Sequence, residues 1–209
     1  MSSLLDAMNK NSRPLASMKA LASVSMRVDG RGAEFPEGII MSGTAMRLET
    51  LNLLYQPVLI IVYNGSVAVL DTGTGACGIS PASLLQHYTH IDVSPVTFRS
   101  LITARLLAQP DNIVSTDRGS ILQGTIDDRR WSSEVDNDLF LTATTVGNAQ
   151  GDAVTCIYRD YTEIDGTKLP GRVTCTWGTN RLAIHYRQAR INVPVDPSLM
   201  DTDKLCGYK

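Results

Sequence analysis

The sequence lacks a long apolar run, an excess of either charge, and any clustering of cysteine or histidine. The longest uninterrupted apolar stretch is the six residues from Val58 to Tyr63, whereas a membrane-spanning helix needs about 20. The 19 Lys and Arg nearly balance the 21 Asp and Glu, for a net charge of −2. A chain with this balance has no overall basic footprint for a phosphate backbone. We therefore expect neither a transmembrane helix nor a nucleic-acid partner.

The sequence also lacks the residue patterns of a metal site or of a nucleophilic catalytic site. The four cysteines form no C-x-x-C pair, and the three histidines are scattered along the chain. A structural zinc site therefore has little support. No serine lies in the G-x-S-x-G sequence that is typical of one large class of hydrolases. We predict no metal, no cofactor and no enzymatic activity.

One short motif does suggest catalysis. Asp71-Thr72-Gly73 follows the apolar stretch 67–70, and an apolar strand that enters Asp-Thr-Gly resembles the active-site turn of aspartic proteases. That chemistry needs two carboxylates that share a proton, and the sequence carries no second copy of the motif. Aspartate and glycine are also common turn residues. An Asp71-based aspartic protease is therefore the least favoured of our hypotheses.

Hydrophobic periodicity predicts one domain over residues 1–209, mainly β. Residues 1–21 have apolar side chains near helical spacing, and Pro14 should kink that helix. Alternation of period two then begins at Ala22 and predicts about four antiparallel strands up to Asp71, with a turn at residues 35–38. About five more strands follow residue 108, and a tail covers 194–209.

Two short helices should interrupt the strands. Ser80-Pro81 and Ser94-Pro95 each place a capping hydroxyl before a proline, and proline suits the first helical position. The second helix carries Phe98, Leu101 and Ile102 on one face, so this face must be buried. The pattern as a whole predicts a large antiparallel sheet with helices gathered on one side.

The hairpin centred on Asp165-Gly166 allows an exact register to be predicted. A two-residue turn there places Tyr158 opposite Val173 and Cys156 opposite Cys175. Opposed Cα atoms in an antiparallel pair lie about 5.5 Å apart at most, which permits a disulfide. Two reduced, buried thiols are an equally good interpretation, since the redox compartment is unknown. Tyr158 and Trp177 share the apolar face with both cysteines.

The connection between the second and third expected strands is unusually apolar. It contains Leu53, Leu54 and Tyr55, where a turn would ordinarily be polar. These side chains either fold back on their own domain or contact a lipid surface or a partner.

Several short sequence segments, taken in their order along the chain, resemble the LolA/LolB lipoprotein-carrier superfamily, in particular its uncharacterised LolB-like outer-membrane lipoproteins. The resemblance extends from about Leu15 to Met200. It is densest in residues 46–51, 52–58, 80–106, 160–166 and 192–197, which include Met46-Arg47-Leu48-Glu49, Tyr161-Thr162-Glu163 and Asn192-Val193-Pro194.

This resemblance implies an α+β, mainly β fold: an incomplete, curved antiparallel β-barrel whose concave face is covered by helices. It implies a non-catalytic cavity that holds lipoprotein acyl chains or another amphiphile during transport to the outer membrane. The helix that begins at Pro95 would then cover the cavity, which we expect to be lined by the following residues: Leu59, Ile61, Phe98, Leu101, Ile102, Tyr158 and Trp177. Which face of the 58–63 strand points inward stays open.

The resemblance also implies partners and a location. The partners would be lipid acyl chains or lipoproteins and the inner leaflet of the outer membrane, which the loop at Leu53, Leu54 and Tyr55 would contact. We expect a monomer on the periplasmic side of the outer membrane. Receptor members of the superfamily are lipid-anchored through an N-terminal cysteine, but this sequence has none before Cys77; the anchor either precedes this chain or is missing from a soluble periplasmic form. The alternative function is a structural or assembly lipoprotein of the outer membrane whose cavity is filled by side chains.

Overall fold

A computed structural model describes residues 2–11, 13–80, 90–147 and 153–207. This part of the chain contains thirteen strands, and every neighbouring pair in the sheet is antiparallel. The strands are β1 Ser17–Val28, β2 Arg31–Ser42, β3 Ala45–Leu51, β4 Pro57–Asn64, β5 Ser66–Asp71, β6 Cys77–Ser80, β7 Asn112–Thr116, β8 Gly119–Ile126, β9 Arg129–Asp136, β10 Leu141–Gly147, β11 Ala153–Ile164, β12 Thr167–Trp177 and β13 Asn180–Ile191.

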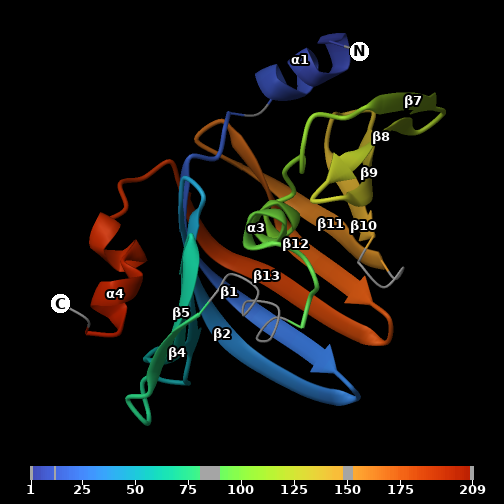
Figure 1. Ribbon diagram of the computed structural model, residues 1–209. Helices are drawn as coiled ribbons and strands as arrows, with labels where there is room; N and C mark the ends of the chain where they lie inside the picture. The colour runs from blue at the N-terminus through green and yellow to red at the C-terminus, as the bar shows by residue number, and fades with distance from the viewer. Residues whose placement is uncertain (1, 12, 81–89, 148–152, 208–209) are drawn as a thin grey trace.

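The strands form one open, curved sheet in the order β6-β5-β4-β3-β2-β1-β13-β12-β11-β10-β9-β8-β7. The first and last strands of the chain's strand series, β1 and β13, pair at its middle, and β6 and β7 lie at its two ends. Figure 1 shows helix α3 (Pro95–Ile102) within the concave side of this sheet. The prediction of an incomplete antiparallel barrel with a helix on its concave face is therefore confirmed.

The predicted helix over residues 1–21 is wrong in its second half. Helix α1 spans Ser2–Asn11, and β1 begins at Ser17. Pro14 stands between them, and proline neither donates to a helical ladder nor allows the preceding residue to stay helical. Met18, which fitted the helical spacing, instead lies on the inner face of β1 and is fully buried. The predicted helix at Ser80-Pro81 lies outside the described residues.

The turn predicted at residues 35–38 is also wrong, because β2 continues through it. The chain turns earlier, at Asp29 and Gly30, which both have positive φ, as the favoured two-residue hairpin turns require. Pro36 lies just beyond the last residue of β2 that pairs with β3, Glu37. A strand tolerates proline where one side has no partner strand, so Pro36 does not end β2.

Both halves contain more strands than predicted. The single strand expected up to Leu51 is divided between β2 and β3, and β6, β7 and β9 were missed. The β11–β12 hairpin, in contrast, has the predicted register, with Cys156 opposite Cys175 and Tyr158 opposite Val173. Asp165 and Gly166 form its turn, both with positive φ. Cys156 and Cys175 are disulfide-bonded, with Cα atoms 3.9 Å apart.

The C-terminal residues 194–209 are not a simple tail. They include the 3₁₀ helix η1 (Pro197–Met200) and the short helix α4 (Thr202–Leu205), which packs beside β4 and β5 (Figure 1). A second disulfide joins Cys77 of β6 to Cys206, and the Asn64 side chain donates to the carbonyl of Met200. Residues 200–206 are thereby fixed to the β6 end of the sheet.

Candidate functional site

A cavity of about 240 Å³ lies between α3 and the strands at the middle of the sheet. Strand alternation explains its apolar lining, because every second residue of a strand faces the same side. The inner-facing residues of β1, β2, β3, β4 and β13 meet two residues of α3 there. The lining consists of Val24, Met26, Phe35, Glu37, Ile39, Leu48, Thr50, Leu59, Ile61, Phe98, Ile102, Leu182 and Ile184.

The structure brings together four of the seven residues for which we predicted a place in the cavity. Leu59 and Ile61 of β4 face Phe98 and Ile102 of α3 across this space, so the odd-numbered residues of β4 point inward. Leu101, Tyr158 and Trp177 do not line it. Leu101 is fully buried in the core, and Tyr158 and Trp177 belong to β11 and β12, farther along the sheet.

Glu37 is the one ionisable side chain among the described residues of this lining. It is 7% exposed, and its Oε2 atom has no hydrogen-bond partner among the described residues. Thr50, directly opposite on β3, provides a hydrogen bond to the carboxyl group, which partly offsets the effect of burial. The pKa of Glu37 is raised to about 8, mainly by burial and to a smaller extent by nearby Glu49. At neutral pH the carboxyl group is therefore mainly protonated.

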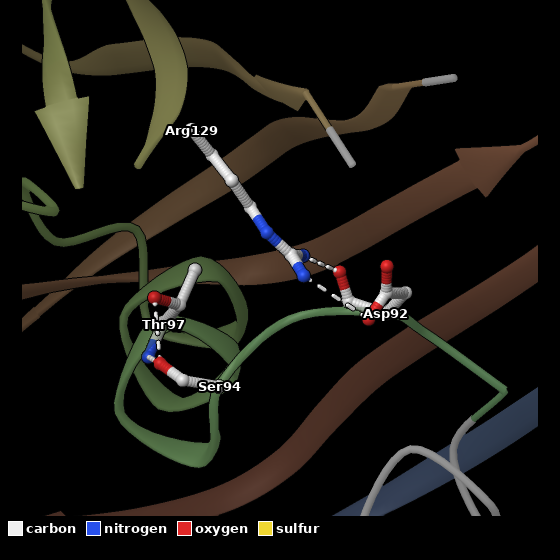
Figure 2. A network of polar contacts seen from close by, with 4 residues as sticks. All are labelled: Asp92, Ser94, Thr97 and Arg129. Atoms are coloured by element: carbon white, nitrogen blue, oxygen red, sulfur yellow. Dashed lines mark hydrogen bonds and ion pairs between the residues drawn. The ribbon is translucent and has the colours of Figure 1, made fainter. Parts of the chain in front are cut away.

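Helix α3 is fastened at its N-terminal end. Ser94 caps the helix by accepting from the backbone N–H of Thr97 at 3.2 Å, as its sequence predicts. In the preceding loop, Asp92 accepts from Arg129 of β9 through both its carbonyl and its carboxylate. Figure 2 shows these two sets of contacts side by side. The loop that leads into α3 is thus tied to the far half of the sheet.

The C-terminal end of α3 is fastened as well. The Tyr186 hydroxyl donates to the carbonyl of Ile102 at 2.9 Å, and full burial raises the pKa of this tyrosine. Arg99 donates to the carbonyl of Leu15 at 3.3 Å, ahead of β1. A movement of α3 away from the sheet must therefore break polar contacts at both ends as well as expose Phe98 and Ile102.

The apolar loop between β3 and β4 projects into solvent. Leu53, Leu54 and Tyr55, here called the apolar tip, are 92%, 77% and 64% exposed. Asn52 shapes this turn, since its Oδ1 accepts from the backbone N–H groups of Leu54 and Gln56. Two backbone hydrogen bonds close the same turn, from Asn52 N–H to the Gln56 carbonyl and from Tyr55 N–H to the Asn52 carbonyl. The apolar tip is left without cover from the described part of the chain.

Leu53 and Tyr55 also border a groove on the outer face of the sheet. This groove has a volume of about 620 Å³. It is lined by residues of β1, β2, β12 and β13, among them Glu34 and His185. We call it the basic groove after its three arginines, Arg172, Arg181 and Arg187.

Like charges lie directly opposite one another in and beside the basic groove. Arg172 pairs with Arg159, and Arg181 pairs with Arg27. Directly opposed like charges destabilise a sheet. Asp160 offsets part of this through an ion pair with Arg172 at 3.5 Å. An anion placed over the groove would reduce the remaining repulsion.

Asp71 has the role of a turn residue. Its Oδ1 accepts from the backbone N–H groups of Gly73 and Thr74 at 2.8 and 3.2 Å. These bonds lower the pKa of Asp71, opposite to the raised pKa of a carboxyl group that acts as an acid at neutral pH. Within the described ranges, no three His, Cys, Asp or Glu side chains gather as a metal site, and none of the described helices has the length and hydropathy to span a bilayer.

Sequence reasoning missed Glu37 and the basic groove. Glu37 was placed in a turn because Pro36 and Gly38 flank it, although the alternation of Phe35 and Ile39 around it was a signal for an inward position. The groove is lined by residues from strands that are distant in sequence, and no local sequence pattern predicts such a cluster.

No protein-family model matches this sequence, and no curated protein matches it. Solved structures do match it along nearly the whole chain. A DUF1329 family protein from Desulfovibrio piger is 12% identical, with a TM-score of 0.73, and the match covers 97% of this chain and 96% of that one. A LolA superfamily protein from Nitrosomonas europaea is 13% identical, with a TM-score of 0.66 over 96% and 97%.

A third match is a domain from Vibrio parahaemolyticus that is named for outer membrane lipoprotein sorting. It is 6% identical, with a TM-score of 0.69, and 97% of each chain is covered. The TM-scores of 0.66 to 0.73 over nearly the whole of each chain show that these structures share the fold described above. The chain thus has the LolA/LolB-like fold that the resemblance of its sequence implies.

Proposed function

We propose that the chain is a non-catalytic carrier that holds an acyl chain, or another amphiphile with an apolar tail, between α3 and the sheet. The observation that carries this proposal is the cavity, whose described lining is apolar except for Glu37 and Thr50. The names of the matching LolA and lipoprotein-sorting structures support the same class of cargo. The setting would be the periplasmic side of the cell envelope.

The energetics favour a cavity of this kind for transport through water. Each buried CH₂ contributes about 0.8 kcal/mol, so several methylenes in contact with Leu48, Ile61 and Phe98 would hold a chain firmly. The cavity volume of about 240 Å³ is below the roughly 300 to 1,000 Å³ of typical ligand pockets. A long acyl chain would therefore require α3 to shift outward, which links loading to the contacts that fasten the helix.

The same small volume favours the alternative, an outer-membrane structural or assembly protein with a filled interior. The hydrogen bonds that join Asp92 and Ile102 to the sheet also favour a helix α3 that stays packed on the sheet at all times. In that case the apolar tip would be the functional surface and the cavity a residual packing space.

The apolar tip and the basic groove together suit contact with a membrane surface. Exposed Leu53 and Leu54 supply apolar area to enter the acyl boundary, and basic side chains near an anionic surface each contribute about 1 kcal/mol. We propose that this side of the molecule faces the inner leaflet of the outer membrane when cargo is handed over.

Native mass spectrometry of protein purified without detergent tests the carrier hypothesis. We expect a lipid to accompany the unmodified protein. Leu59→Trp, which fills the cavity, should remove the lipid, and Val114→Trp, at an exposed position of β7, should retain it. A protein that carries no lipid and binds no fluorescent fatty acid would establish the filled-interior alternative.

A further inference from the structure

A cavity that only shelters a hydrocarbon chain has no need of Glu37. Hydrocarbon needs no polar partner, yet an inward position of β2 carries a carboxyl group beside Phe35 and Ile39. Its Oε2 is buried and has no hydrogen-bond partner among the described residues. Buried polar atoms in native proteins are nearly always paired, so an unpaired one within a binding cavity marks a place for a ligand atom.

The chemistry of Glu37 restricts what that ligand atom can be. A protonated carboxyl group has one O–H to donate, besides its capacity to accept, and the raised pKa of Glu37, about 8, keeps it protonated at neutral pH. An ionised ligand group would lose its hydration in this apolar lining, at a high cost in free energy. A neutral acceptor, such as a carbonyl oxygen, loses far less and gains the hydrogen bond.

We propose that Glu37 is a specificity-determining residue that donates a hydrogen bond to the ester or amide carbonyl of an acylated ligand. This assignment rests on the proposed carrier function and goes beyond it, because it makes the cavity selective for acyl esters and amides over plain hydrocarbon. It also sets the depth of the ligand, since the carbonyl must lie at the level of Glu37 and Thr50 with the tail toward Ile61 and Phe98.

Displacement of a fluorescent fatty-acid analogue by methyl dodecanoate and by tetradecane, which have equal chain length, tests the assignment. We expect the ratio of ester affinity to alkane affinity to be roughly fivefold to tenfold higher for the unmodified protein than for Glu37→Leu, the effect of one hydrogen bond. Glu37→Gln retains an N–H donor and should keep the ratio of the unmodified protein. Glu37→Leu should bind tetradecane at least as well, and thermal unfolding checks that each variant is folded.

Infrared spectra of the bound ester, labelled with ¹³C at its carbonyl, give a second readout that does not depend on relative affinities. A hydrogen-bonded carbonyl absorbs at lower frequency than the same ester in hexane, and Glu37→Leu should restore the hexane value. The same ester-to-alkane ratio in the unmodified protein and in Glu37→Leu, or a carbonyl band at the hexane position, overturns the role of Glu37 and leaves carriage intact. Failure of both compounds to bind overturns the carrier function and this assignment with it.

Discussion

The inner and outer faces of the same strands, β1, β2 and β13, differ completely in character. The inner face presents Ile39 and Leu182 to an apolar cavity with one protonated carboxyl group, whereas the outer face presents Arg181 and Arg187 to solvent beside the apolar tip. Because neighbouring residues of a strand point to opposite sides, the two surfaces are one sheet thickness apart. A carrier with this arrangement holds its cargo on one side and meets its target with the other.

This separation has a physical consequence for mutations. Inner-face substitutions change packing, and packing contributes to the free energy of unfolding. Outer-face substitutions change surface charge and exposed apolar area, which contribute little to folding but directly to association. The comparison holds if each kind of variant alters one property and leaves the other unchanged.

The largest effect is expected from the double substitution Leu53→Glu and Leu54→Glu in the apolar tip. Both leucines would leave the membrane interface, and a fully buried leucine contributes about 1.5 to 3 kcal/mol. Vesicle co-flotation should therefore fall more than a hundredfold, with the melting temperature unchanged. The matched control is Thr72→Glu with Thr74→Glu, in the neighbouring exposed β5–β6 turn. Retained flotation of the tip variant would show that the tip does not contact lipid.

Phe98→Ala should have the largest effect on folding. Phe98 is 4% exposed and packs against the cavity, and deletion of a buried phenylalanine costs about 3 to 5 kcal/mol. Denaturant unfolding measures this cost, and Val96→Ala, on the exposed side of α3, should cost less than about 0.5 kcal/mol. The enlarged cavity should accept longer acyl chains if α3 forms its wall. A loss of stability below about 1 kcal/mol would mean that α3 is loosely packed.

Glu37→Gln should remove a pH dependence of stability. The folded protein holds the Glu37 proton up to a pKa of about 8, and the unfolded chain releases it near 4.5. Stability from this group is therefore complete below about pH 4.5 and declines as pH rises to 8, by at most about 1.4 kcal/mol per pH unit.

The difference between the unfolding free energies of Glu37→Gln and the unmodified protein, measured from pH 4 to 9, isolates this contribution from other titrating groups. As the pH rises, the unfolding free energy of Glu37→Gln should increase relative to that of the unmodified protein. Glu34→Gln, on the exposed outer side of β2, is the matched control for loss of one carboxyl group. A flat difference for Glu37→Gln would mean that its carboxyl group is hydrated.

The smallest effect is expected from Arg181→Ser in the basic groove. Loss of about 1 kcal/mol of attraction to an anionic surface corresponds to about fivefold weaker binding to phosphatidylglycerol vesicles. Binding to purely zwitterionic vesicles should not change. Asn180→Ser, the neighbouring position on β13, is the matched control. Equal loss on both kinds of vesicle would point to a change in the tip rather than in surface charge.

Local chemistry in the sequence predicted several elements accurately. Ser94 and Pro95 marked the start of α3, because a capping hydroxyl and a proline at the first helical position act within one turn. Asp165 and Gly166 fixed the register of β11 and β12, since a two-residue turn leaves one pairing possible. The fold class followed from strand alternation together with the family resemblance.

Errors arose where local signals competed with pairing to distant strands. Pro36 indicated a turn, but β1 and its partners extend β2 past it. Leu15 and Met18 have helical spacing, but pairing of β1 with β13, far away in the sequence, places Met18 in a strand instead.

By itself, then, the sequence determined the strand-rich class, the α3 cap and the opposed Cys156 and Cys175, since each depends on residues within one hairpin or one helical turn. Only the tertiary structure decided that Glu37 faces a cavity and that Cys77 meets Cys206. The same holds for the arginines that flank the apolar tip. These placements depend on which strands become neighbours, and that choice is made by burial of the whole inner face rather than by any local run of residues.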